Sequence, residues 1–362
     1  MATPAITPED TIPAQSGIGH RIRAIRSNYL LRKFIRALLT ALAAVTFTFF
    51  LVRLLPGNPI EVYINQLIST YGIPYNEAQD QAASLFSLDL DQPVILQYFN
   101  YLGNLLRGDL GTSILSPGTP VLAIIQRFLP WTLFSLGLAL ILSFTVGMIL
   151  GVVIAFRREG WLDHILTVIG SFLSSVPDYL LAIIIIVWLG VQLEILPIAE
   201  MRGVLSPGVK PELSLAFIQD ALFHVFPVVA VYFLATVGRW MLTMKNSSVA
   251  VLEEDYVTVG RAKGLKESRI LGSYVGRNAS LPLFTALTIT LGFIVGGSVL
   301  VETIFNYRGI GHTLFQAISR RDYTLMQAIF LILTFSVIFA NFFTDILYGW
   351  IDPRIRLDNS DS

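Results

Sequence analysis

Apolar residues dominate six stretches of this chain, and each stretch is long enough to cross a lipid bilayer. An α-helix rises 1.5 Å per residue, so about 20 apolar residues span the roughly 30 Å hydrocarbon core. The chain is 54% hydrophobic, with a mean hydropathy of +0.66. The six stretches cover residues 34–55, 131–156, 165–189, 222–244, 281–301 and 325–350. The pattern predicts an all-α polytopic membrane protein with six transmembrane helices.

A charged segment at residues 253–282 separates the fourth and fifth apolar stretches. Its apolar residues recur at helical spacing on both sides of Gly264, namely Leu252, Tyr256 and Val259 before it and Ile270, Leu271, Tyr274 and Val275 after it. Acidic residues open the first of these helices, where the helix dipole favours negative charge. We expect two short amphipathic helices in water, broken at Gly264. The segment either docks a partner or lies on lipid headgroups as an ordinary charged loop; its net charge of about +1 and the glycine break favour docking.

Basic residues are distributed unevenly around the six stretches. Sixteen of the 25 Lys and Arg residues lie on the side that holds both termini and the 253–282 segment. Cytoplasmic flanks of transmembrane helices collect Lys and Arg, so both termini and this segment are expected in the cytoplasm. Residues 1–28 lack periodicity, which predicts a disordered cytoplasmic tail, and residues 353–362 form a second cytoplasmic tail.

The chain leaves the membrane on the opposite side after the first stretch, for residues 56–127. Amphipathic patches there predict a small helical extracytoplasmic lobe, because so long a connection is seldom a bare loop. Residues 29–130 would then comprise the first transmembrane helix and this lobe. Residues 131–352 would comprise a five-helix core that includes the charged loop at 246–280.

Two pairs of glycines lie four residues apart in the second and fifth stretches: Gly147 with Gly151, and Gly292 with Gly296. Small residues at this spacing let helices approach closely. Packing within the subunit is the favoured interpretation, ahead of packing between subunits. Because six helices alone make a thin pathway, a dimer of such subunits is the simplest way to line one.

The sequence contains little material for catalysis, metal binding or nucleotide binding. It has no cysteine, and its four histidines are scattered, so we expect no metal site. The glycine-containing stretch from Gly260 to Lys266 lacks the order of residues that cradles a phosphate. We therefore expect no catalytic residue, no cofactor and no nucleic-acid partner, and any ATP must be bound by another polypeptide.

Charged residues inside the apolar stretches form a separate group of candidates, because each costs at least a few kcal/mol at the bilayer centre. They are Asp178, Arg239, Glu302 and Asp345. Asp178 follows Pro177 and is expected at a break in the third helix, and Arg239 lies near enough to the cytoplasmic end to snorkel. Two roles stay open for these charges, namely structural pairing or snorkelling, and a place along a substrate path, for which Arg308 is a further candidate.

Many ordered motifs between Arg32 and Arg356 are similar to those of a known family. Two of them lie in the charged segment, EDYVTVGRAKGL at residues 254–265 and RNASLP at residues 277–282. The others are RLLPGNP (53–59), LLRGDLGTS (105–113), SVPDYL (175–180), VETIFNYRGIGHTL (301–314), RRDYTLMQA (320–328) and DILYGWIDPRIR (345–356). With these motifs the chain resembles the inner-membrane permease subunits of binding-protein-dependent ABC importers, in the oligopeptide and dipeptide branch.

The resemblance implies the ABC importer permease fold, a set of partners and a cargo. Such a subunit pairs with a second, similar permease, two cytoplasmic ATPase subunits and an extracytoplasmic solute-binding protein. Residues carried over as the ATPase-coupling element are Glu254, Asp255, Tyr256, Arg261, Ala262, Lys263, Gly264 and Leu265. Closure of the ATPases would move this element and, through rigid helices, an external gate. The implied cargo is short peptides, with oligosaccharides and nickel as alternatives within the branch.

The chain departs from the family's pattern at a few positions. Gly260 stands where alanine is expected, which lowers helix propensity by about 1 kcal/mol. Asp178 replaces a common serine and Arg308 a usual proline. Both are candidates for the substrate path, so the solute specificity of the family does not transfer directly to these positions. Two other functions remain as alternatives: an ion-coupled secondary transporter that acts alone, and a membrane enzyme that uses Asp178 or Asp345.

Overall fold

The computed structural model describes residues 29–54, 59–86, 93–114, 116 and 118–351. Within these ranges the regular structure is helical, apart from an isolated bridge between Thr112 and Pro120. The predicted all-α class is therefore confirmed for the described residues. The two predicted cytoplasmic tails, 1–28 and 353–362, lie outside them.

In the part of the chain that the structure describes, four helices are long and apolar enough to cross a membrane: α2 (Tyr29–Arg53), α6 (Val121–Phe156), α9 (Leu215–Leu252) and α16 (Tyr323–Ile351). Two of them extend well beyond the apolar stretches that predicted them, since α6 has 36 residues and α9 has 38. Both helices also continue through a proline, Pro130 in α6 and Pro227 in α9. The apolar stretch marks the part of a helix that suits a lipid environment, whereas backbone hydrogen bonding continues past it.

The third apolar stretch is broken, as Pro177 predicted. It consists of α7 (Trp161–Ser175), followed by α8 (Asp178–Ile184) and a π-helical continuation η1 (Ile185–Gln192), and the two parts are bent by 102°. A proline disfavours the helical conformation of the residue before it, and Val176 is accordingly extended, with ψ of 124°. Counting this bent pair as one span gives five candidate spans among the described residues.

The fifth apolar stretch is also interrupted, which the sequence analysis did not anticipate. It contains α13 (Leu281–Ile294), an apolar helix of 14 residues, and part of α14 (Val299–Ile304). The chain turns between them at Gly297, whose φ of +66° favours glycine. The Ser298 hydroxyl then caps α14 by accepting a hydrogen bond from the Val301 amide at 3.2 Å. Because α13 is shorter than a full span, the count of six transmembrane helices stays a prediction.

Glycines allow α6, α7 and α9 to pack in backbone contact. A Cβ added to Gly147 or Gly151 of α6 would lie 2.5 Å from the Cβ of Trp240 or Met244 of α9, respectively. The second glycine pair faces α16, since a Cβ on Gly292 would lie 2.5 Å from the Cβ of Ala340. Both predicted glycine pairs therefore mediate helix packing within the subunit.

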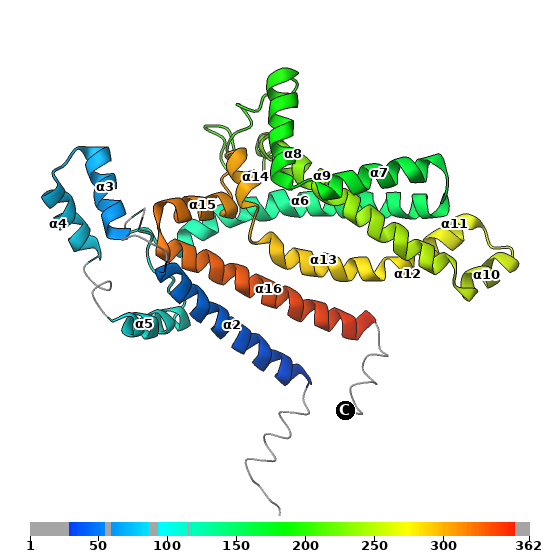
Figure 1. The fold of residues 1–362 in the computed structure, drawn as a ribbon, viewed down its shortest axis with the longest axis horizontal. Coiled ribbons are helices and arrows are strands. Elements are labelled where there is room, and N and C mark those ends of the chain that lie inside the picture. Colours follow the sequence, from blue (N-terminus) through cyan, green and yellow to red (C-terminus); the bar gives the residue numbers. More distant parts are fainter. Residues whose placement is uncertain (1–28, 55–58, 87–92, 115, 117, 352–362) are drawn as a thin grey trace, which may run out of the picture.

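The shorter helices gather at the two ends of the long ones (Figure 1). At one end lie α3 (Pro59–Tyr71), α4 (Tyr75–Phe86) and α5 (Val94–Leu106), and at the opposite end lie α10 (Asp255–Ala262) and α11 (Glu267–Arg269). A small apolar core of Ile64, Leu67, Ala78 and Ala82 joins α3 to α4. The remaining elements are η2 (Ile270–Gly276), α12 (Arg277–Ala279) and α15 (Ile310–Arg320). Residues 59–86 and 93–106 thus contain the three helices α3, α4 and α5, and the 253–282 segment lies at the other end of the molecule. The extracytoplasmic lobe stays a prediction.

Candidate functional site

The 253–282 segment folds as the predicted helix, glycine turn and helix. Helix α9 ends at Leu252, and α10 begins at Asp255, with two residues between them. At the end of α10, Gly264 has φ of +72° and donates its amide to the Arg261 carbonyl at 2.9 Å. Leu265 then donates its amide to the Gly260 carbonyl at 3.2 Å, which closes a helix end of the kind that glycine favours. Gly264 is thus the hinge residue of the turn because its backbone conformation is one that L-residues rarely adopt.

A small apolar core fixes the segment to the helices on either side of it. Val257, Ile270 and Val275 are fully buried against one another. Val251 and Leu252 at the end of α9, together with Leu265, pack against this core. Beyond it, η2 and α12 continue into α13 with only Ser280 between them. A displacement of the segment would therefore be carried directly into α9 and α13.

The predicted apolar face of the first helix differs from the buried face that the structure shows. Tyr256 and Val259 are exposed, at 39% and 49%, while Val257 occupies the core. Leu252, the third member of the expected face, belongs to the end of α9. The exposed Tyr256 ring stacks on Tyr274, with ring centroids 6.3 Å apart. The Tyr256 hydroxyl accepts a hydrogen bond from the side-chain amide of Asn278 at 3.0 Å. These contacts hold Tyr256 in place while it remains accessible.

The proposed coupling residues lie together on this exposed segment. Glu254, Asp255, Arg261, Ala262, Lys263 and Gly264 are exposed, and Leu265 is half-buried. Arg261 and Glu267 form an ion pair across the glycine turn, with Nε and Oε1 3.4 Å apart. Both side chains are about half exposed, at 47% and 51%, so this pair adds little stability. The segment thus presents acidic and basic side chains around the exposed side chains of Tyr256 and Val259.

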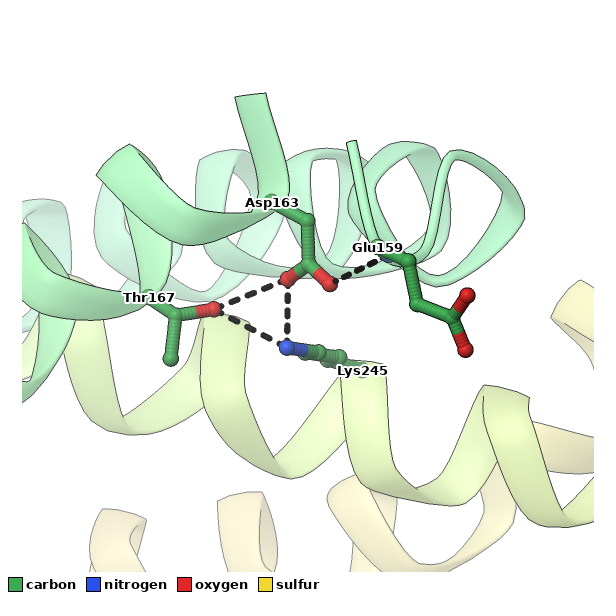
Figure 2. Close-up of polar contacts among 4 residues, drawn as sticks. All are labelled: Glu159, Asp163, Thr167 and Lys245. Carbon is green, nitrogen blue, oxygen red and sulfur yellow. Dashed lines mark hydrogen bonds and ion pairs between the residues drawn. The ribbon is translucent and has the colours of Figure 1, made fainter. Parts of the chain in front are cut away.

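A buried ion pair that the sequence analysis missed lies close to the base of the segment. Figure 2 shows Asp163 of α7 between Lys245 of α9, Thr167 and the backbone of Glu159. Lys245 Nζ pairs with Asp163 Oδ1 and also lies 3.0 Å from the Thr167 hydroxyl. The other Asp163 oxygen accepts the Glu159 amide at 3.1 Å. Sequence alone gave only a weak signal, because Asp163 comes just before the third apolar stretch and Lys245 just after the fourth.

Among the charges considered for a substrate path, Glu302 has a structural role. Its side chain is fully buried, and its carboxylate accepts the Thr132 hydroxyl at 2.9 Å and the His312 amide at 2.9 Å. Thr132 Oγ1 in turn accepts the Ile310 amide at 2.7 Å. The carboxylate thus joins α6 and α14 to the amino-terminal end of α15, where a negative charge is favoured. These contacts are those of a structural side chain, and a place for Glu302 along a substrate path stays a prediction.

The other candidate charges are accessible. Asp178 begins α8 and is half-buried, and Arg239 is exposed on α9. Arg308 is exposed in the connection between α14 and α15. Burial, with a contribution from the Arg308 charge, lowers the pKa of His312 below its ordinary value. The side chain of Asp345 lies outside what the structure describes. The structure therefore separates the buried Glu302 from the more accessible Asp178, Arg239 and Arg308.

Comparison with known proteins identifies the family. Residues 147–357 match the family described as "Binding-protein-dependent transport system inner membrane component". The chain is 34% identical over 326 residues to the di/tripeptide transport system permease protein DppB of Pseudomonas aeruginosa, covering 85% of this chain and 93% of that protein. It is 30% identical over 330 residues to the oligopeptide transport system permease protein AppB of Bacillus subtilis, covering 91% and 99%.

A third relative comes from a transport system with a different stated solute. The glutathione transport system permease protein GsiC of Salmonella choleraesuis is 31% identical over 330 residues, with 91% of this chain and 99% of that protein covered. The family match and the near-complete coverage of these relatives confirm the resemblance drawn from the motifs. The chain belongs to the family of inner-membrane components of binding-protein-dependent transport systems, and it is the permease component of an ABC importer.

Proposed function

We propose that this permease forms half of the translocation pathway for short peptides and is driven by ATPase subunits through its 253–282 segment. A second, similar permease supplies the other half of the pathway. A solute-binding protein delivers the cargo on the extracytoplasmic side, where α3, α4 and α5 form the small helical lobe. Both termini and the 253–282 segment lie in the cytoplasm, with six transmembrane helices between the two sides.

One observation carries the proposal, namely the rigid attachment of an exposed surface to two long helices. Tyr256 and Val259 are exposed on α10, while Val257 on the same helix is buried in the core shared with Ile270 and Val275. An ATPase that binds this exposed surface moves α9 and the chain leading into α13 as one body. Motion at the cytoplasmic end then reaches the breaks beside Asp178 and Ser298, in the manner of a rigid-body transition.

Peptide cargo is supported by the relatives' names, which specify di/tripeptide, oligopeptide and glutathione transport. Oligosaccharides and nickel remain alternative cargoes for the same machinery. An ion-coupled secondary transporter is the alternative mechanism, and it predicts uptake that collapses with an uncoupler and survives loss of the ATPases. Import that requires ATP and persists with an uncoupler in proteoliposomes would exclude that mechanism.

The coupling role is tested in the complete complex in proteoliposomes. Gly264→Pro removes the positive φ, and Glu254→Lys with Asp255→Lys reverses the charge at the start of α10. We expect each variant to insert normally but to lose ATPase association, or to hydrolyse ATP without transport. Glu200→Lys with Glu212→Lys is the matched control, because it makes the same charge change at exposed positions between η1 and α9. Normal coupled uptake by the Gly264 and Glu254/Asp255 variants would refute the docking role.

A further inference from the structure

One face of α9 carries a line of polar side chains through the part of the helix expected to cross the membrane. The residues are Tyr232, Thr236, Arg239, Thr243 and Asn246, and we call them the α9 polar stripe. They are spaced by four and three residues alternately, so they lie on a single face of the helix. Arg239 and Asn246 are exposed, and the other three are half-buried.

Tyr232, at one end of the α9 polar stripe, packs against the buried clusters that include Leu181 and Leu283. The other four residues lie to one side of the contacts that α9 makes with α6 and α7. Trp240 and Met244 contact α6 at its glycines, and Gly238 contacts α7 at Gly170. At about 100° per residue, these contact positions lie roughly 80° to 120° around the helix from the centre of the stripe. Polar groups facing acyl chains are costly, and charged residues in transmembrane segments nearly always face a bundle interior or a water-filled cavity. Arg239 therefore requires water or an anionic group, and no ion pair among the described residues supplies one.

Arg239 carries the charge of this stripe. Among the described residues, no carboxylate forms an ion pair with it. Snorkelling toward the cytoplasmic end would accommodate Arg239 alone. It would leave Thr236, which lies about one turn farther from that end, on the same side of the helix as Arg239.

An opposite charge lies at the other end of the stripe. Asp178 sits at the break between α7 and α8, and its Oδ2 lies 3.4 Å from the hydroxyl of Ser298, at the break before α14. Tyr232, the first residue of the stripe, packs against the buried cluster that includes Leu181 of α8 and Val301 of α14. Within the described ranges, Asp178 also lacks an ion-pair partner. Two helix breaks thus place this carboxylate, which accepts the Tyr179 amide and the Ser298 hydroxyl, where the stripe begins.

We infer that the α9 polar stripe is a solute-binding wall of the pathway, where Asp178 receives a cationic group and Arg239 an anionic group of the same solute. Tyr232 and Arg239 are separated by seven residues of α9, or about 10 Å along the helix axis. This is roughly the length of three extended peptide residues. A small zwitterion with its charges at opposite ends fits these dimensions. The inference rests on the proposed function, because it assumes that the subunit lines a solute pathway.

The first test asks whether the stripe faces water. The chain has no cysteine, so Thr236→Cys and Thr243→Cys each introduce a single thiol into this subunit. Phe226→Cys is the matched control, because Phe226 is 48% exposed on the same helix but apolar. In the full complex, with cysteine-free partners, we expect a charged methanethiosulfonate reagent to label the stripe thiols at least tenfold faster than the control during ATP turnover. Labelling no faster than the control in any nucleotide state would overturn the inference, whether lipid or the second permease covers the stripe.

The second test asks whether the two charges recognise the two ends of a solute. The probes are trialanine, trialanine amide and N-acetyl-trialanine, each delivered at a saturating concentration of the loaded solute-binding protein. Arg239→Gln should reduce the preference for trialanine over its amide by about tenfold or more, and Arg239→Lys should retain that preference. Asp178→Asn should reduce the preference for trialanine over N-acetyl-trialanine. Arg202→Gln, an exposed residue outside the stripe, should change neither ratio.

The two tests separate failure of the inference from failure of the proposed function. If the wild-type complex imports trialanine and the Arg239 and Asp178 variants keep both preferences, the inference is overturned while peptide import stands. If the wild-type complex imports none of the three probes, the proposed peptide cargo fails. In that case the thiol-labelling test still decides whether the stripe lines the pathway.

Discussion

Gly238 of α9 and Gly170 of α7 lie in backbone contact, and a Cβ on Gly170 would come within 3.5 Å of the Gly238 Cα. A Cβ on Gly238 would overlap with the Gly170 carbonyl oxygen and lie 2.6 Å from the Ser174 hydroxyl. Because the obstacle is backbone, it cannot move aside as a flexible side chain would. The bent pair formed by α7 and α8 is therefore held against α9 at a point where only glycine fits.

We expect Gly238→Ala to destabilise the subunit by about 1 to 3 kcal/mol through overpacking. Thermal unfolding of the detergent-solubilised complex would measure the effect. Gly137→Ala in α6 is the matched control, since a Cβ there meets nothing within 4 Å. A Gly238 variant as stable as the control would contradict the contact.

The two glycines of α10 and its turn should respond in opposite ways to alanine. A Cβ on Gly260 would lie 3.6 Å from Leu265 Cδ1, an ordinary packing distance, so Gly260→Ala should stabilise α10 by about 1 kcal/mol. Gly264 has φ of +72°, so Gly264→Ala should cost about 1 to 2 kcal/mol. Hydrogen exchange of the α10 amides would report both changes. Faster exchange in the Gly260 variant than in wild type would show that helix propensity does not limit the stability of α10.

The buried pair of Asp163 and Lys245 predicts strong coupling between two substitutions. Lys245→Met leaves the Asp163 carboxylate buried without its cation and should cost about 3 to 5 kcal/mol. Adding Asp163→Asn removes the uncompensated charge and should recover part of that loss. A double-mutant cycle on thermal unfolding would measure the coupling. Additive effects of the two substitutions would argue against the pair.

Thr132 links α6 to the start of α15, and its removal should loosen that helix. Thr132→Val deletes the donor to one Glu302 oxygen and the acceptor of the Ile310 amide, which leaves that buried amide unpaired at a cost of about 1 to 3 kcal/mol. We expect faster hydrogen exchange at the Ile310 and His312 amides. Thr334→Val is the control, because the Thr334 hydroxyl bonds to the Phe330 carbonyl within its own helix. Unchanged exchange at both amides would rule out this role for Thr132.

Much of the outline was predictable from the sequence, because it depends on local patterns. Apolar stretches mark long helices wherever the chain suits lipid, Pro177 marks the break before Asp178, and Gly264 marks the turn after α10. The charged segment between two apolar stretches was equally visible. The glycine pairs also predicted close packing within the subunit. Each of these signals lies within a few residues of the feature that it predicts.

Which side chains of these elements meet was decided by the tertiary structure. Helical spacing selected Tyr256 and Val259 as the apolar face of α10, but Val257 is the residue that reaches the core formed after the turn. The interruption of the fifth stretch at Gly297 was equally hidden, because apolar residues flank it on both sides. A periodic pattern identifies a face of a helix without identifying the surface that the face meets.

The charges show the same division most clearly. Sequence placed Asp178, Arg239 and Glu302 in one class, as ionisable residues in apolar stretches. The fold buries Glu302 among donors from α6 and α15, leaves Asp178 and Arg239 without ion pairs among the described residues, and joins Asp163 to Lys245 across 82 positions of the chain. Composition and periodicity report which groups must avoid lipid. Only the packing of distant helices determines which of these groups form ion pairs or hydrogen bonds within the subunit.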